Sequence, residues 1–235
     1  MKKVILYGKH SVQSALENNK RKILQIFISD KSPDIFLSLA KKRNVKIKLV
    51  DKEQLNKISK TNNHQGIAAE CESIFQQFDI NTCKAQNAII ALDQITDIQN
   101  IGAIIRSAYA FGINKILIPG TNFPDEVGGI SKLSAGCVDR IDIQITSNLA
   151  RSLEILKKEG FWIIGLDAHC DNSINKFEFP EKTVIIFGSE GKGMRHLTKK
   201  HCDYLVQIPM KKGAESLNVS ASAAITLYKY FSQNI

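Results

Sequence analysis

The stretch PMKKGAESLNVSASAAI, residues 209–225, joins a short polar loop to the start of a helix rich in small residues. Asn218 is placed to cap this helix, and Ser216 or Ser220 can share that task. One cap leaves the other polar side chains without a role in the helix, so we expect them to contact a ligand. The small residues 221–224 indicate a helix that packs closely against another chain segment or a second subunit.

A second polar stretch, LDQITDIQNIGAIIRSAYAFG, follows an apolar run and contains an amphipathic helix. Asn100 lies near the start of this helix, and Arg106 follows six residues later on a face with Gly102 and Ala103. Small neighbours let the guanidinium approach a partner closely. The alternative is an Asn that only caps the helix and an Arg that is only solvated.

In a third stretch, VIIFGSEGKGM, an apolar strand ends at Gly188. Gly188, Gly191 and Gly193 lie within six residues and let the backbone approach a ligand. The spacing matches neither the Walker phosphate loop nor the dinucleotide-binding pattern. Glu190 would repel a phosphate and suits a neutral or cationic ligand better. The alternative is a plain glycine-rich turn.

Apolar strands that alternate with helices predict an α/β fold with a mostly parallel sheet covered on both faces. In such sheets, ligands bind beyond the carboxyl ends of the strands. The expected strands are residues 87–93, 115–119, 141–145, 161–167, 183–188 and 204–209, and the expected helices are 98–112, 147–160, 193–201 and 218–233.

The first third of the chain forms a separate, basic α/β unit. Strands are expected at residues 22–29 and 44–50, and helices at 32–43 and 50–59. Residues 1–86 contain 16 Lys and Arg against 8 Asp and Glu, so they carry +8 of the net charge of +9. This charge favours a polyanionic partner such as RNA over a merely soluble basic face.

Several classes of protein are disfavoured. The longest apolar runs are too short to cross a bilayer, and the first residues do not form a signal peptide. The five cysteines are scattered without a CxxC pair, which predicts reduced thiols in a cytoplasmic protein and no metal site.

Together, the stretches NIGAIIRSAYAFG, FGSEGKGM and IPMKKGAESLNVSASAA resemble the three motifs of the SpoU (TrmH) family of RNA ribose 2′-O-methyltransferases. YGKHSVQSALE and HQGIAAE resemble the small RNA-binding domain, similar to ribosomal protein L30e, of bacterial 23S rRNA guanosine 2′-O-methyltransferases. The resemblance implies an L30e-like substrate-binding domain at 1–72, a linker at 73–86 and a catalytic domain at 87–235. It also implies a SPOUT-type trefoil knot, a homodimer and S-adenosylmethionine (SAM) as cofactor.

The resemblance also assigns site residues. The family's catalytic positions correspond to Asn100, Arg106, Glu190, Ser216 and Asn218. The cofactor-binding positions correspond to Gly188, Glu190, Gly191, Ile208, Met210, Ser216 and Leu217. The paired Lys211 and Lys212 are more basic than the motif leads us to expect, and they either hold RNA phosphate or are neutral in their effect.

Methyl transfer to a ribose hydroxyl requires alignment of the donor with the acceptor and removal of one proton. A guanidinium rarely gives up its proton, so Arg106 suits phosphate binding and alkoxide stabilisation better than the role of base. Glu190 can position Arg106 or accept the proton through water, and the two asparagines can orient these groups. The alternatives are the same reaction on transfer RNA and a non-catalytic RNA-binding protein.

Overall fold

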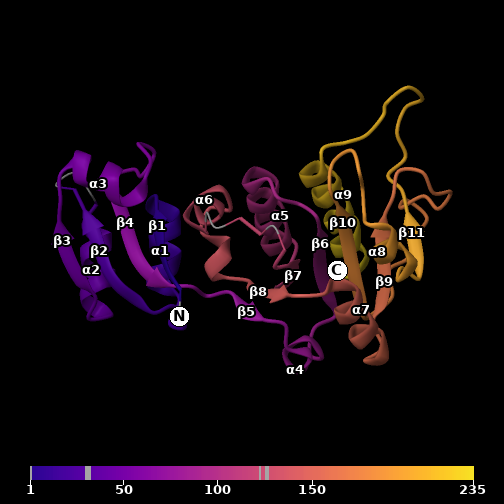
Figure 1. The fold of residues 1–235 in the computed structure, drawn as a ribbon, viewed down its shortest axis with the longest axis horizontal. Coiled ribbons are helices and arrows are strands. Elements are labelled where there is room, and N and C mark those ends of the chain that lie inside the picture. The colour runs from indigo at the N-terminus through magenta and orange to yellow at the C-terminus, as the bar shows by residue number, and fades with distance from the viewer. Residues whose placement is uncertain (1, 30–32, 122, 125–126) are drawn as a thin grey trace. The chain divides into compact units, whose positions relative to one another are not determined.

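The computed structural model describes residues 2–29, 33–121, 123–124 and 127–235. The chain divides into two compact units (Figure 1). Unit 1 consists of Met1–Ile74 and Pro124–Arg140, and unit 2 of Phe75–Phe123 and Ile141–Ile235. The chain therefore passes between the units three times, because a segment from the middle of the sequence belongs to unit 1.

Unit 1 contains, within its described residues, a four-stranded sheet in the order β1-β4-β2-β3, with β2 and β3 parallel and the other pairs antiparallel. Its elements before Ile74 are β1 (Lys3–Tyr7), α1 (Lys9–Glu17), β2 (Ile23–Ile28), α2 (Asp34–Lys42), β3 (Lys46–Leu49), α3 (Lys52–Ser59) and β4 (Ile67–Glu72). The four elements expected from the sequence are confirmed as β2, β3, α2 and α3; Ser32, in the expected helix entry, lies outside the described residues.

Residues 124–140 pack tightly on unit 1 through α6 (Val127–Leu133) and the 3₁₀ turn η1 (Cys137–Asp139). A Cβ atom on Gly128 would lie 2.2 Å from the carbonyl oxygen of Ile5, so only glycine allows α6 to approach β1 this closely. In η1, the Asp139 carboxylate accepts Arg21 Nε–H at 2.7 Å and Arg21 Nη2–H at 3.1 Å, and both side chains are fully buried. The segment is thus an integral part of unit 1.

Unit 2 contains a sheet of seven strands in the described residues, in the order β11-β9-β10-β6-β7-β8-β5, and each neighbouring pair is parallel. The strands are β5 (Gln76–Gln77), β6 (Ala88–Asp93), β7 (Lys115–Pro119), β8 (Asp142–Thr146), β9 (Trp162–Leu166), β10 (Thr183–Gly188) and β11 (Tyr204–Val206). The helices are α4 (Ile80–Cys83), α5 (Ile98–Ala110), α7 (Leu149–Lys158), α8 (His196–Lys200) and α9 (Val219–Gln233). The expected parallel sheet is confirmed, and the region expected as a linker contains β5 and α4.

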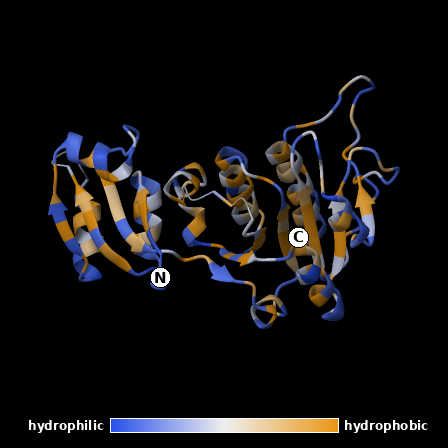
Figure 2. Ribbon diagram, in the orientation of Figure 1, coloured by the Kyte–Doolittle hydropathy of each residue, from blue (hydrophilic) through white to orange (hydrophobic). Residues whose placement is uncertain are grey.

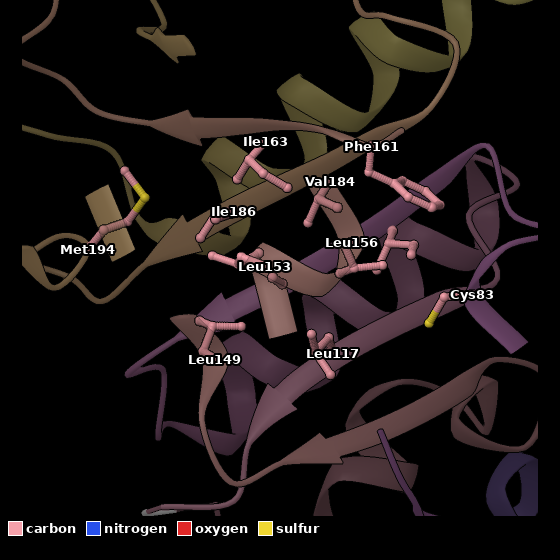
Figure 3. Close-up of a cluster of buried hydrophobic side chains, with 12 residues drawn as sticks. Cys83, Leu117, Leu149, Leu153, Leu156, Phe161, Ile163, Val184, Ile186 and Met194 are labelled. Carbon is pink, nitrogen blue, oxygen red and sulfur yellow. The ribbon is translucent and has the colours of Figure 1, made fainter. Parts of the chain in front are cut away.

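Helices cover both faces of this sheet. On one face, α7 contributes Leu149, Leu153 and Leu156 to a buried cluster with Ile163 and Ile186 of the strands (Figure 3). Side chains alternate between the faces of a strand, so the neighbouring residues of β6 and β10 face the opposite side, where α5 and α9 pack together. The central strands are accordingly hydrophobic throughout, whereas the helices are amphipathic (Figure 2).

The five cysteines are unpaired, as the sequence predicts. Burial raises the pKa of Cys71 and of Cys202 to about 12, so these two thiols keep their protons at neutral pH. Within the described ranges, no helix has both the length and the apolar character that a bilayer span requires.

Candidate active site

Asn100, Glu190 and Asn218 meet beyond the carboxyl ends of β6 and β10, the neighbouring strands at which the strand order of the sheet reverses. Asn218 Nδ2 donates to Glu190 Oε1 at 2.5 Å and to Asn100 Oδ1 at 3.0 Å. Asn100 Nδ2 donates to the same Glu190 oxygen at 3.1 Å. We refer to these three side chains as the amide–carboxylate triangle. It joins three segments that are far apart in the sequence.

Asn100 is available to the triangle because another residue caps its helix. Asp97 is the N-cap of α5, and its Oδ1 accepts the backbone N–H of Gln99 at 2.9 Å. Asp97 Oδ2 also accepts from Asn100 Nδ2 at 3.4 Å, which helps to orient the amide. The alternative reading of Asn100 as a simple helix cap is therefore wrong, and its side chain is buried at the site.

Asn218 has two roles at once. Its Oδ1 caps α9 by accepting the backbone N–H groups of Ser220 and Ala221 at 2.9 and 3.3 Å, while its Nδ2 belongs to the triangle. The Ser220 hydroxyl also donates to this Oδ1. Ser216 is exposed and makes no hydrogen bond with any residue that the structure describes. The polar side chains of this stretch thus have different roles: Asn218 and Ser220 form the cap, Asn218 also belongs to the triangle, and the Ser216 hydroxyl is exposed.

Glu190 projects from a tight loop that continues β10. Ser189 and Gly193 close the loop with two backbone hydrogen bonds of 3.1 and 2.9 Å, and Gly191 and Gly193 adopt φ values of 76° and 65°. The three N–H donors to Oε1 are Asn100 Nδ2, Asn218 Nδ2 and the backbone of Val219. Among described residues, none donates to Oε2, so this second carboxylate oxygen is open to a ligand or water.

Arg106 is on the exposed part of α5 and is not bonded to the triangle. Its guanidinium has no hydrogen bond or ion pair with the described part of the chain. The neighbouring turn of the helix carries Gly102 and Ala103, which leave the side chain room to move. Arg106 is thus a cation without a partner among the described residues, on the helix that carries Asn100.

The residues predicted to hold the cofactor lie in two loops at this end of unit 2. Gly188 and Gly191 belong to the Glu190 loop, and Ile208, Met210, Ser216 and Leu217 belong to the long segment 207–218 between β11 and α9 (Figure 1). Counting only described residues, the main chain between Ile208 and Leu217 makes one backbone–backbone hydrogen bond, from Ala214 N–H to Lys211 O at 3.0 Å. The other main-chain groups can bind the polar edges of a base, and the exposed apolar side chain of Leu217 can cover its face. These residues fit the nucleoside part of SAM.

Asp93 and Arg195 belong to the site but escape prediction from the sequence. Asp93 is the last residue of β6 and is fully buried, and Arg195 immediately precedes α8. Asp93 Oδ2 accepts Arg195 N–H at 2.8 Å, and Asp93 Oδ1 accepts Arg195 Nε–H at 2.7 Å. The available signal in the sequence is that Asp93 ends one apolar strand and that Arg195 follows the glycine-rich stretch after another. As for metals, the described residues contain no group of His, Cys, Asp or Glu that could hold an ion.

Known families match almost the whole chain. The sequence model of the SpoU rRNA Methylase family matches residues 87–228, and the model described as RNA 2′-O ribose methyltransferase substrate binding matches residues 5–77. A 23S rRNA (guanosine-2′-O-)-methyltransferase of Neisseria meningitidis is 33% identical over 230 residues, which cover 94% of this chain and 92% of that protein.

Further relatives agree with these matches. An uncharacterized tRNA/rRNA methyltransferase of Synechocystis is 37% identical over 97% of this chain, which spans only 62% of that relative's length. The fold is similar to that of the SpoU methyltransferase AviRb of Streptomyces viridochromogenes, solved with its cofactor AdoMet, with a TM-score of 0.85 and 20% identity. That likeness covers 99% of this chain and 90% of AviRb. The chain belongs to the SpoU family of RNA methylases.

Proposed function

We propose that this protein transfers a methyl group from SAM to a ribose 2′-OH in RNA, with a guanosine of 23S rRNA as its substrate. The observation that carries the proposal is the amide–carboxylate triangle, in which one residue from each of the three SpoU-like motifs meets beyond β6 and β10. A protein that only bound RNA would have no need for a buried amide and a carboxylate in contact at this position.

SAM, when bound, supplies an electrophilic methyl group on a sulfonium. The chain holds this molecule with main-chain groups and small side chains of the Glu190 loop and of residues 208–217, including Ser216. Binding both reactants in one orientation is worth several kcal/mol, up to roughly 7–11 in ideal cases. The protein's principal contribution is therefore alignment.

The polar side chains bind the RNA phosphate, stabilise the alkoxide and accept the proton. Arg106, exposed on α5, binds the phosphate next to the target ribose and stabilises the developing alkoxide. The Oε1 atom of Glu190 is occupied by three N–H donors, so Oε2 is left to receive the hydroxyl proton through water. Asn100 and Asn218 hold that carboxylate in place.

The substrate is proposed from charge and from the relatives. Residues 1–72 carry +8 of the net charge of +9 and act as the substrate-binding domain, while unit 2, residues 75–123 and 141–235, acts as the catalytic domain. Several relatives at about this level of similarity are named as 23S rRNA guanosine methyltransferases. We accordingly propose that the protein acts in the cytoplasm.

A homodimer and a knotted C-terminal segment are part of the same proposal. On α9, Ile225 and Tyr228 are 43% and 60% exposed and lie three residues apart, on one face of the helix. Such an apolar face is suited to the same face of a second copy. The small side chains of residues 221–224 allow α9 to pass close to other backbone.

A map of ribose 2′-O-methyl groups tests the proposed substrate. Ribosomal and transfer RNA from cells with and without the gene would be compared at nucleotide resolution. We expect one 23S rRNA guanosine to lose its methyl group, and complementation to restore it. Loss of a transfer RNA methyl group instead would assign the alternative substrate, and an unchanged map would contradict both.

A further inference from the structure

We propose that Asp93 is a positioning residue for methyl transfer, acting through Arg195 to fix the loop that carries Glu190. This inference rests on the proposed function, because it assigns Glu190 a place in the reaction. Asp93 itself is fully buried and cannot reach a substrate. Its effect must therefore pass through the residues that it binds.

Asp93 stands at the junction of two site segments. It is the last residue of β6, the strand that leads to α5 and Asn100, and it pairs in register with Gly188, the last residue of β10. Its two carboxylate oxygens bind Arg195, at the far end of the Glu190 loop. One side chain thus ties the segment that carries Asn100 to the segment that carries Glu190.

Residues 193–195, which lead from the Glu190 loop to α8, are each held by a contact. Gly193 pairs with Ser189, Met194 is buried in the core cluster (Figure 3), and Arg195 is bound to Asp93. This segment lies so close to β10 that a Cβ atom on Gly188 would be 2.3 Å from the carbonyl carbon of Gly193. Of these three anchors, only the one at Arg195 depends on a charge.

The Asp93–Arg195 pair does not behave like an ordinary surface ion pair. The carboxylate is desolvated and hydrogen-bonded by a backbone N–H as well as a guanidinium, so removing its charge shifts the loop and not merely a side chain. A shift of about 1 Å in a positioned group can reduce turnover roughly 100-fold. Glu190 receives its three N–H donors only if the loop holds its place.

Asp203 offers a matched control within the same unit. Its carboxylate likewise accepts one backbone N–H, from Ile163 at 2.8 Å, and one cation, Lys157 Nζ at 2.6 Å. Asp203 precedes β11 and lies at the amino edge of the parallel sheet, opposite to the site. Removing the charge of Asp203 weakens one hydrogen bond to a backbone N–H and one ion pair, as in Asp93, but leaves the contacts of the Glu190 loop intact.

The test compares Asp93→Asn and Asp203→Asn with the wild-type chain. Steady-state methylation of 23S rRNA gives kcat and KM, calorimetry gives SAM affinity, and hydrogen exchange of the SAM-free protein reports on amides 189–195. We expect Asp93→Asn to lower kcat about 10- to 100-fold and SAM affinity no more than about threefold, with faster exchange in the loop. Asp203→Asn should leave kcat and loop exchange unchanged.

A wild-type kcat in Asp93→Asn, or equal kcat losses in both variants in step with their melting temperatures, would overturn the inference. If Asp93→Asn does not fold, Arg195→Lys keeps the positive charge and the backbone N–H while removing Nε; it should lower kcat to a smaller extent and loosen the same amides. Unchanged exchange and kcat in that variant would equally overturn it. If the wild-type protein does not methylate RNA, the proposed function is contradicted. Hydrogen exchange of amides 189–195 would still test whether Asp93 fixes the Glu190 loop.

Discussion

Arg106 differs from the triangle residues in that no described residue holds its guanidinium. We therefore predict that Arg106→Ala lowers kcat about 100-fold or more, the typical effect of losing a donor to a developing oxyanion. SAM affinity should stay close to the wild-type value, because the partners of Arg106 are ribose and phosphate. Single-turnover methylation and calorimetric titration measure the two quantities.

Arg106→Lys is the matched variant, since it keeps the charge but not the planar donor pair. It should retain part of the activity. A parallel loss of SAM binding in either variant would remove Arg106 from the proposed role. At this scale the residue types alone left Asn100, Glu190 and Asn218 open between site residues and ordinary caps or turns, and the resemblance to the SpoU motifs assigned them to the site. Asp93 could not be predicted, because an aspartate at the end of a strand can equally well be solvated.

The loop between β11 and α9 brings Lys211 and Lys212 to the same edge of the sheet as Glu190. Lys211 and Lys212 are exposed, and neither pairs with an acidic group in the described ranges. If both contact RNA phosphates, the double alanine variant should lower the slope of log affinity against log salt by about 1.4–1.8, taking about 0.7–0.9 per contact. Filter binding at several salt concentrations measures this slope.

Lys158 and Lys200 form the control pair, because they are exposed at the ends of α7 and α8, which lead to the amino edge of the sheet. Their double alanine variant should keep the wild-type slope. Equal slopes for both double variants would mean that the paired lysines of the loop do not touch the backbone of RNA.

Helices and strands could be predicted from the sequence where the hydrophobic periodicity and the length of the segment indicate the same type of element. The apolar runs that become β6 and β10 and the amphipathic helix α5 are unambiguous, because their buried faces are set by local periodicity. By contrast, β5 consists of Gln76 and Gln77, and it exists only because β8 offers a free edge. Likewise α6 contains two glycines, and tertiary contacts with β1 override its weak helical propensity.

At the scale of the whole molecule, residues 124–140 set a limit on where the chain can be cut. Val127, Ile130 and Val138 are buried in unit 1, and Asp139 is buried against Arg21. Deleting residues 1–74 would uncover this apolar surface and leave a buried carboxylate without its partner. We predict that residues 75–235 alone aggregate or unfold at lower urea than the full chain.

The control removes both pieces of unit 1, joining Phe123 to Ile141 with a flexible linker of about six residues. This shorter protein should aggregate less and unfold at a higher urea concentration than residues 75–235, as measured by light scattering and urea unfolding. Equal behaviour of the two proteins would show that residues 124–140 do not depend on unit 1. The division could not be predicted from the sequence, because it depends on contacts between residues more than 100 positions apart.

Transfer of a labelled methyl group by the purified protein tests the central claim most directly. Full-length 23S rRNA, transfer RNA and labelled SAM would be incubated with the wild-type chain and with Arg106→Ala, and the RNA digested to nucleosides. We predict that the label appears in 2′-O-methylguanosine from 23S rRNA and is nearly absent with Arg106→Ala. Label on a base, or no transfer to any RNA by a folded protein that binds SAM, would contradict the account.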